Sequence, residues 1–126
     1  MSGYGQICPL AQALEVLGER WTLLVVRELL CGSHRFSEIQ RGVPLMSRSV
    51  LAQRLRSLAD AGVLERRGEG YWLTEAGDEL RPIVIACGNW GKRWANPSLS
   101  LSRISTSSPV CGSVRARSRS CLVVTR

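Results

Sequence analysis

The stretch 47–62 constrains the fold more strongly than any other part of this 126-residue sequence. Ahead of it, a Gly-Val-Pro sequence at 42–44 would break any preceding helix, and Ser47 is a favoured N-cap residue. Gly62 is a favoured residue just beyond a helix C-terminus. Between these signals, apolar residues recur at helical spacing, as on the buried side of a helix. They are Val50 or Leu51, Leu55 and Leu58. The sequence therefore predicts a helix over about 47–61.

Shorter helices are expected before this one. The spacing of apolar residues predicts a first helix over about 8–17, with a proline in its first turn. A third helix is expected over about 37–41, where Ser37 can act as the N-cap. Between them, a second helix is expected over about 21–30. Its buried face is expected to consist of Trp21, Leu24, Val25 and Leu29.

A hairpin and a last helix are expected after residue 62. Segments at 63–67 and 71–73 flank a Gly-Glu-Gly sequence, which predicts two short strands joined by a tight turn. Thr74 can cap the helix that follows, and Pro82 is expected to bend or restart it. The run 82–94 carries more apolar surface than the terminal helix of a small domain should show. We therefore expect it to pair with a second copy of the chain.

This order of elements is typical of a winged helix-turn-helix domain, a mainly α fold with a small β-hairpin (α+β). The helices over 37–41 and 47–61 would form the helix-turn-helix, and residues of about 66–71 would form the wing. In such a domain the second helix of the motif enters the major groove of DNA. A winged-helix module that binds protein without binding DNA would have the same pattern, so the sequence leaves that alternative open.

The net charge of +7 suggests a polyanionic partner, but the charge is unevenly distributed. Residues 1–96 hold 12 Lys and Arg against 10 Asp and Glu, whereas residues 97–126 hold five Arg and no acid. We therefore expect one DNA-binding domain over 7–96 and a Ser/Arg-rich, mostly disordered tail over 97–126. Non-specific binding of nucleic acid by the tail alone is an alternative source of affinity.

Other classes of function find little support in the sequence. One histidine, no phosphate-binding loop and no Ser/His/Asp grouping argue against an enzyme and against a cofactor. A redox enzyme that uses cysteine alone is the remaining enzymatic alternative. The five cysteines include no CxxC pair, so we expect neither a metal site nor a disulfide framework. Without a run of roughly 18 to 20 apolar residues or a secretory signal, we expect a cytoplasmic protein with no membrane partner.

Short motifs between residues 7 and 95 carry a resemblance to a known family. They are Cys8-Pro9, Gly18-Glu19-Arg20-Trp21-Thr22, Arg27-Glu28-Leu29, Arg35-Phe36, Ser47 to Gly62, Leu73 to Gly77 and Trp90 to Trp94. They resemble the HxlR-type regulators of transcription. The resemblance implies a MarR-like homodimer, joined by its N- and C-terminal helices, that binds double-stranded operator DNA. We expect a repressor, and activation is the alternative that the sequence leaves open. The Gly-Glu-Gly turn is shorter than the usual wing loop of the family, which argues against deep minor-groove contact.

The first turns of the 47–61 helix are expected to read base edges. Arginine can bind guanine through two hydrogen bonds, and glutamine can bind adenine in the same way. Arg48, Ser49 and Gln53 are therefore the candidates for base contacts. Ser47 would cap the helix, and the free N–H groups beside it could hold a phosphate. The alternative for these residues is a solvated surface.

Further arginines are candidates for contacts with the DNA backbone. They are Arg35, Arg54, Arg56, Arg66 and Arg67. Because alternate residues of a strand point to opposite faces, at least one arginine of the wing should face DNA. The alternatives are an ordinary surface charge and, on the 47–61 helix, an ion pair of Arg54 or Arg56 with Asp60.

Cysteine and tryptophan residues suggest where an effector and a second copy would bind. Cys8 stands at a helix start, a position that favours thiolate. We expect this cysteine to pack at the dimer interface. Sensing of oxidants or electrophiles is the alternative, and the resemblance strengthens it, because some regulators of this type sense through a cysteine in this place. Cys31 and Cys87 are expected to be packed within apolar helices. Stacking of tryptophans on an aromatic small-molecule effector is a further alternative. The dimer interface of the last helix is expected to include Ile83, Val84, Cys87, Trp90 and Trp94.

Overall fold

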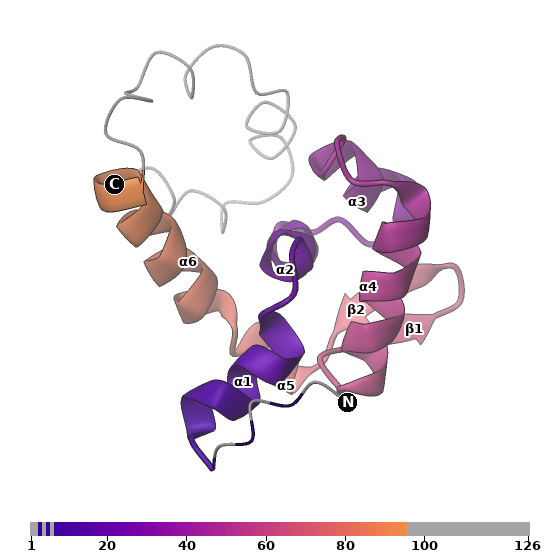
Figure 1. Cartoon of the computed structure of the whole chain (residues 1–126). Helices are drawn as coiled ribbons and strands as arrows, with labels where there is room; N and C mark the ends of the chain where they lie inside the picture. The colour runs from indigo at the N-terminus through magenta and orange to yellow at the C-terminus, as the bar shows by residue number, and fades with distance from the viewer. Residues whose placement is uncertain (1–2, 4, 6, 96–126) are drawn as a thin grey trace.

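Helices flank a two-stranded antiparallel hairpin in the computed structural model, which describes residues 3, 5 and 7–95 (Figure 1). In chain order the elements are α1 (Pro9–Leu17), α2 (Thr22–Leu30), α3 (Phe36–Gly42), α4 (Arg48–Asp60), β1 (Leu64–Arg67), β2 (Gly70–Leu73), α5 (Glu75–Asp78), α6 (Arg81–Trp90) and the π-helix η1 (Gly91–Ala95). The predicted winged-helix architecture, mainly α with a small hairpin, is confirmed. The expected tail over 97–126 lies outside the described residues.

The core lies between α2, α3, α4 and the hairpin. On α4 the predicted inner side is buried, with Leu51, Leu55 and Leu58 each exposing 1% or less. From α2, Val25 and Val26 are fully buried against the same cluster. In Figure 1, α2 is seen nearly end-on between α6 and α4. Because α4 packs on both α2 and β1, its orientation relative to the rest of the domain is fixed by the core.

The ends of α4 follow the local signals in the sequence. The Ser47 hydroxyl accepts a hydrogen bond from the Val50 backbone N–H over 3.3 Å and caps the helix. At the other end, Gly62 adopts a φ of 79°, a left-handed conformation that glycine takes without steric cost. That residue turns the chain directly into the hairpin, so the predicted helix and its stop signal are both confirmed.

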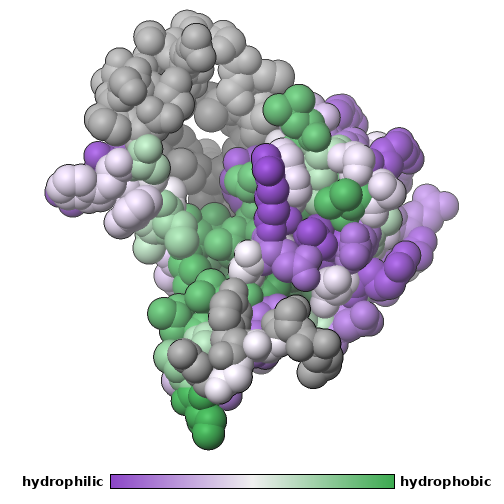
Figure 2. Space-filling model, in the orientation of Figure 1, coloured by the Kyte–Doolittle hydropathy of each residue, from purple (hydrophilic) through white to green (hydrophobic). Residues whose placement is uncertain are grey.

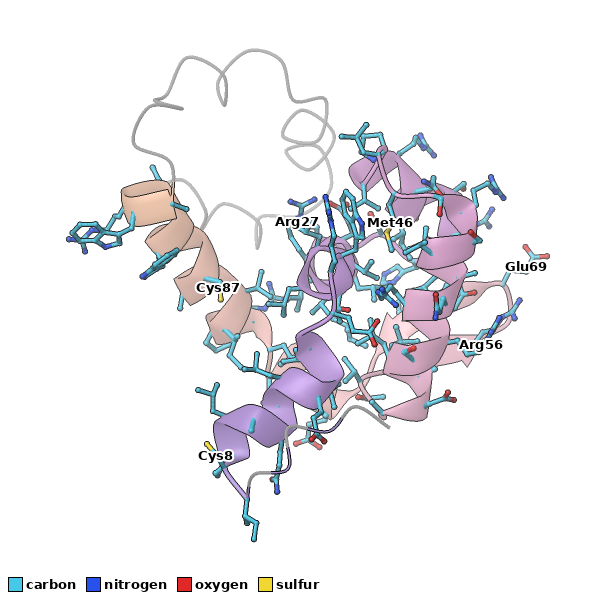
Figure 3. All side chains as sticks on the ribbon, viewed as in Figure 1. Cys8, Arg27, Met46, Arg56, Glu69 and Cys87 are labelled. Carbon is cyan, nitrogen blue, oxygen red and sulfur yellow. The ribbon has the colours of Figure 1, made fainter. Side chains whose placement is uncertain are left out.

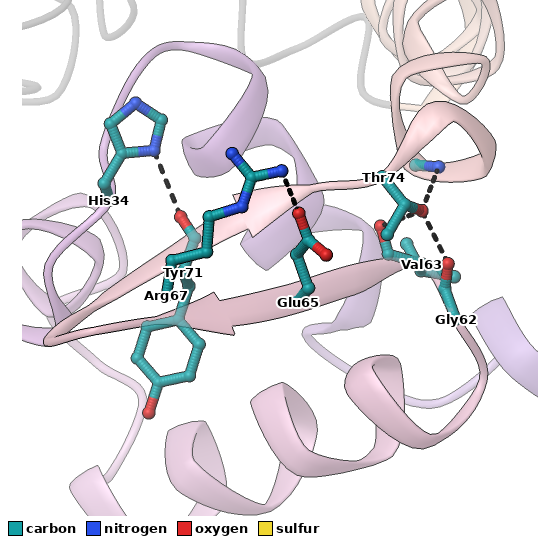
Figure 4. Close-up of polar contacts among 8 residues, drawn as sticks. His34, Gly62, Val63, Glu65, Arg67, Tyr71 and Thr74 are labelled. Carbon is teal, nitrogen blue, oxygen red and sulfur yellow. Dashed lines mark hydrogen bonds and ion pairs between the residues drawn. The ribbon is translucent and has the colours of Figure 1, made fainter.

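Thr74 connects the hairpin to the helices that follow it (Figure 4). Its hydroxyl donates to the Val63 carbonyl over 3.0 Å and accepts from the Gly77 backbone N–H over 3.3 Å. Gly77 is buried, and a Cβ there would overlap the carbonyl oxygen of Val63. The predicted cap is confirmed, and α6 restarts with Pro82 in its first turn, as expected.

The expected N-cap of α3 is wrong. Arg35 is the N-cap, and Ser37 lies inside the first turn of the helix. The physical reason is Glu38, whose carboxylate accepts hydrogen bonds from the backbone N–H groups of His34 and Arg35 at 3.0 and 3.3 Å. Glu38, at the third position of the helix, thus fixes the chain at His34 and Arg35 so that the helix starts before Ser37.

The expected buried face of α2 is only partly correct. Val25 and Leu29 are buried, but Leu24 remains 39% exposed. Trp21 is half-buried and precedes the helix as its N-cap. The helix is rotated so that Val26 and Leu30 complete the buried side. Cys31 is buried as expected, whereas Cys87 on α6 is exposed, because nothing within the described residues packs over that side of α6.

Candidate nucleic-acid interface

The outer side of α4 carries the residues predicted to read bases. Ser47, Arg48, Ser49 and Gln53 are all exposed, while the opposite side of the helix is in the core. The Arg48 guanidinium lies 5.1 Å from the ring centroid of Phe36 on α3, which links the two helices of the motif. The helix therefore presents an arginine, two hydroxyl groups and an amide from a rigid support, the combination that direct base readout requires.

The hairpin places its two arginines differently. The Arg66 guanidinium lies 5.8 Å from the ring centroid of Tyr71, its partner in the strand register. Arg67 forms an ion pair with Glu65 (Figure 4). Both arginine side chains are exposed. The wing thus offers positive charge close to solvent, with the charge of Arg67 shared with a neighbouring carboxylate.

The wing is attached to the loop between α2 and α3 through His34. The Tyr71 backbone N–H donates to the His34 carbonyl over 2.7 Å, and Nδ1 of His34 lies 3.1 Å from the Tyr71 carbonyl oxygen. The imidazole also stacks on the Trp72 ring at a centroid distance of 3.6 Å. Arg35 adds an isolated bridge to Gly70. Sequence reasoning missed this anchor, because His34 and Tyr71 are 37 residues apart and no spacing rule connects them.

The remaining predicted arginines do not form one set. Arg35, at the start of α3, and Arg56, on α4, are exposed. In Figure 3, Arg56 lies on the same side of the molecule as Glu69 at the wing tip. Arg54 differs, since it pairs with Glu19 in the loop before α2, not with Asp60. We define the recognition surface as the exposed residues Arg35, Ser47, Arg48, Ser49, Gln53, Arg56, Arg66 and Arg67.

The opposite side of the molecule is apolar. Large side chains of α1, α6 and the segments beside them are strongly exposed. In Figure 2 the hydrophobic colour is concentrated at the lower left, over α1 and the start of α6. We call this set the apolar face: Ile7, Leu10, Leu14, Ile83, Trp90 and Trp94, exposed by 98, 66, 40, 44, 63 and 64%. Of the residues predicted for a dimer interface, Val84 is half-buried against the core, and the others are exposed.

Among the residues that the structure describes, two exposed thiols lie on the apolar side. Cys8 is the N-cap of α1 and Cys87 lies on α6, and both are free. Figure 3 shows them on the side of the molecule away from Arg56 and Glu69. Among residues 3, 5 and 7–95, no three His, Cys, Asp or Glu side chains gather as a metal site would require. In the same residues, no helix combines the length and apolarity needed to span a bilayer.

Comparison with known proteins agrees with this architecture. The model of the HxlR-like helix-turn-helix family matches residues 16–99. The HTH-type transcriptional regulator YvaP of Bacillus subtilis is 39% identical over 102 residues, covering 74% of this chain and 94% of YvaP. The regulator Rv3095 of Mycobacterium tuberculosis is 38% identical over 92 residues, but the match spans 56% of its length.

Solved structures show the same fold. Quinone-bound YodB from B. subtilis superposes with a TM-score of 0.62 at 33% identity, covering 70% of this chain and all of YodB. The redox regulator HypR in its reduced form superposes with a TM-score of 0.64 at 29% identity, covering 73% of this chain and 96% of HypR. The relatives named here are regulators, which supports the prediction that the chain is not an enzyme.

Proposed function

The chain belongs to the HxlR-like helix-turn-helix family of transcriptional regulators, and from that premise we propose that it represses genes by binding operator DNA as a homodimer. The observation that carries the proposal is the outer side of α4, where Arg48, Ser49 and Gln53 are exposed on a helix whose other side is buried. In the complex, α4 enters the major groove and the short wing contacts the backbone beside it.

The homodimer is proposed from the apolar face. Contiguous apolar surface of this kind is uncommon on monomeric proteins and marks a site of association. A second copy covers it by symmetric pairing of α1 and α6, with Cys87, Trp90 and Trp94 in the contact. Such a dimer presents two copies of α4, as an operator with two half-sites requires.

Cys8 is proposed as the site at which the regulator responds to oxidants or electrophiles. The thiol is free and exposed at the N-cap of α1. Relatives described as quinone-bound YodB and redox regulator HypR support this assignment. Modification at this position would alter the end of a helix that contributes to the proposed dimer, and so could change the distance between the two copies of α4.

The experiment that tests the function is selection of bound fragments from the host genome, followed by electrophoretic shifts at rising salt. We expect a two-fold symmetric site and an affinity that falls steeply with salt. Arg48→Ala should weaken operator binding by about tenfold or more, since one bidentate base contact discriminates by about 1–3 kcal/mol. Arg81→Ala, which removes the same charge at the start of α6, is the matched control. Failure of wild-type protein to retain any fragment would favour a protein-binding winged helix.

A further inference from the structure

Arg54 follows Gln53 on α4, but its side chain is largely withdrawn from solvent. Its Nη1 lies 2.6 Å from Oε2 of Glu19, and its Nε donates a 2.9 Å hydrogen bond to the backbone carbonyl of Arg20. Only 14% of the Arg54 side chain is exposed. Both partners belong to the loop between α1 and α2. A single side chain therefore fastens the middle of α4 to a loop that is 34 residues away in the sequence.

That loop has an unusual backbone conformation. Trp21 has a φ of 78°, in the left-handed region that bulky residues rarely occupy. Such a conformation persists only where its surroundings hold it. Trp21 packs against the core, the guanidinium of Arg20 lies 5.5 Å from its ring centroid, and the Arg20 carbonyl is the group that Arg54 binds. The contacts of Arg54 are thus part of what holds the loop in place.

The same contacts make Arg54 a poor ligand for phosphate. Its charge is already paired with a carboxylate, and two of its nitrogens, Nη1 and Nε, already contact oxygens of the protein. A phosphate that approached Arg54 would also approach Glu19, whose side chain is 61% exposed and would repel it. Arg56 is exposed on the same helix, and the contacts described for it include neither an ion pair nor a neighbouring carboxylate.

We propose that Arg54 is a positioning residue that orients the recognition helix and does not contact DNA. The inference rests on the proposed function. Because α1 leads into the loop and carries part of the apolar face, the link between Arg54 and Glu19 ties α4 to the dimerisation side of the molecule. The link thereby sets the direction in which each copy of α4 presents Arg48, Ser49 and Gln53 to its half-site.

Glu19→Gln is the decisive variant. Opposite changes in operator affinity are expected if Glu19 positions Arg54 and if Glu19 is only an acid near the DNA. Removal of an acid near DNA should tighten binding if Glu19 is only a nearby charge. If Glu19 holds Arg54, operator affinity should fall by about tenfold, the range of measured coupling between paired residues. Affinity for non-specific DNA should stay unchanged, so the ratio of specific to non-specific binding should fall. A purely stabilising role would leave that ratio unaltered in folded protein.

Arg54→Gln and the double variant complete a cycle with Glu19→Gln. We expect the double variant to bind the operator no more weakly than Arg54→Gln alone, with the slope of log affinity against log salt unchanged. A slope reduced by about 0.9 in Arg54→Gln would identify a phosphate contact and overturn the inference. Unchanged or tighter operator binding by Glu19→Gln would overturn it as well.

Two controls separate this inference from its premise. Glu79→Gln removes an exposed acid at the end of α5 and should leave the specificity ratio unchanged. Thermal unfolding of each variant establishes that the protein is folded at the assay temperature. Because the Glu19 side chain is exposed, Glu19→Gln still tests the inference if Arg54→Gln does not fold. Wild-type protein that binds no operator would overturn the proposed function and the inference together, whereas the outcomes above overturn the inference alone.

Discussion

The two sides of this molecule differ in how far their apolar side chains are buried. On the side of α3, α4 and the hairpin, most apolar side chains are buried and much of the surface is polar or charged (Figure 2), with Leu45 and Trp72 as exposed apolar exceptions. On the side of α1 and α6, tryptophan and leucine side chains face solvent, and α6 has no buried residue. We call the first side the closed side, because its apolar residues pack mostly within this chain. We call the second the open side, because large apolar residues of α1 and α6 remain exposed on it.

Two glycines, Gly77 and Gly88, differ in the space around them in the same way. A Cβ at Gly77 would overlap the carbonyl oxygen of Val63 and crowd Leu73, while a Cβ at Gly88 on α6 would meet nothing within 4 Å. Close packing leaves no room for one added carbon at Gly77. At Gly88, a single copy leaves space for the added carbon, so a clash caused by a Cβ there would have to involve a partner.

The largest expected effect is that of Gly77→Ala on stability. The added methyl group meets backbone, which cannot move aside as a flexible side chain can, so the free energy of unfolding should fall by about 3 kcal/mol. Urea unfolding followed by circular dichroism measures this change. Gly88→Ala is the control, and should raise the stability of the monomer by about 0.5–1 kcal/mol, as alanine does in a helix. A loss of stability by Gly88→Ala in the dimer alone would place a partner against α6.

Trp90→Ala should have the next largest effect, on association instead of folding. Trp90 is 63% exposed in one copy, so its truncation removes little from the core of that copy. In a dimer it would become a buried aromatic anchor, and the dissociation constant should rise by about thirtyfold, corresponding to about 2 kcal/mol. Analytical ultracentrifugation over a range of concentrations measures the shift. Trp72→Ala, at another exposed tryptophan on the hairpin, should leave the dissociation constant unchanged.

The features predicted correctly from the sequence are those that depend on neighbouring residues in the chain. Local signals identified α4 completely: Ser47 caps it, Gly62 ends it, and the leucine spacing gives its buried side. Each of these depends on residues within one helix. The exposed candidates Arg48, Ser49 and Gln53 were therefore also predictable, because they lie on the sides of α4 away from its buried leucines.

What the sequence did not predict depends on contacts between distant segments. His34 anchors the wing, and Arg54 pairs with Glu19, through approaches that only the packed fold creates. Leu24 was expected to be buried because helical spacing alone does not tell which apolar residues of α2 face the core, and it is 39% exposed. The predicted Ser37 cap was wrong because Glu38 binds the backbone N–H groups of His34 and Arg35, which starts the helix before Ser37.

The smallest expected effect concerns the wing, where the closed side is least tightly packed. His34→Ala removes the Nδ1 contact with the Tyr71 carbonyl and the stacking on Trp72, but keeps the backbone hydrogen bond from Tyr71. The free energy of local opening should fall by about 1 kcal/mol, the usual net value of one such hydrogen bond. Amide hydrogen exchange at Tyr71 should accelerate about fivefold, while exchange at Leu55 in α4 stays unchanged. Equal acceleration at both amides would mean that His34 stabilises the whole domain, and that the wing is not a separate, weaker part of the closed side.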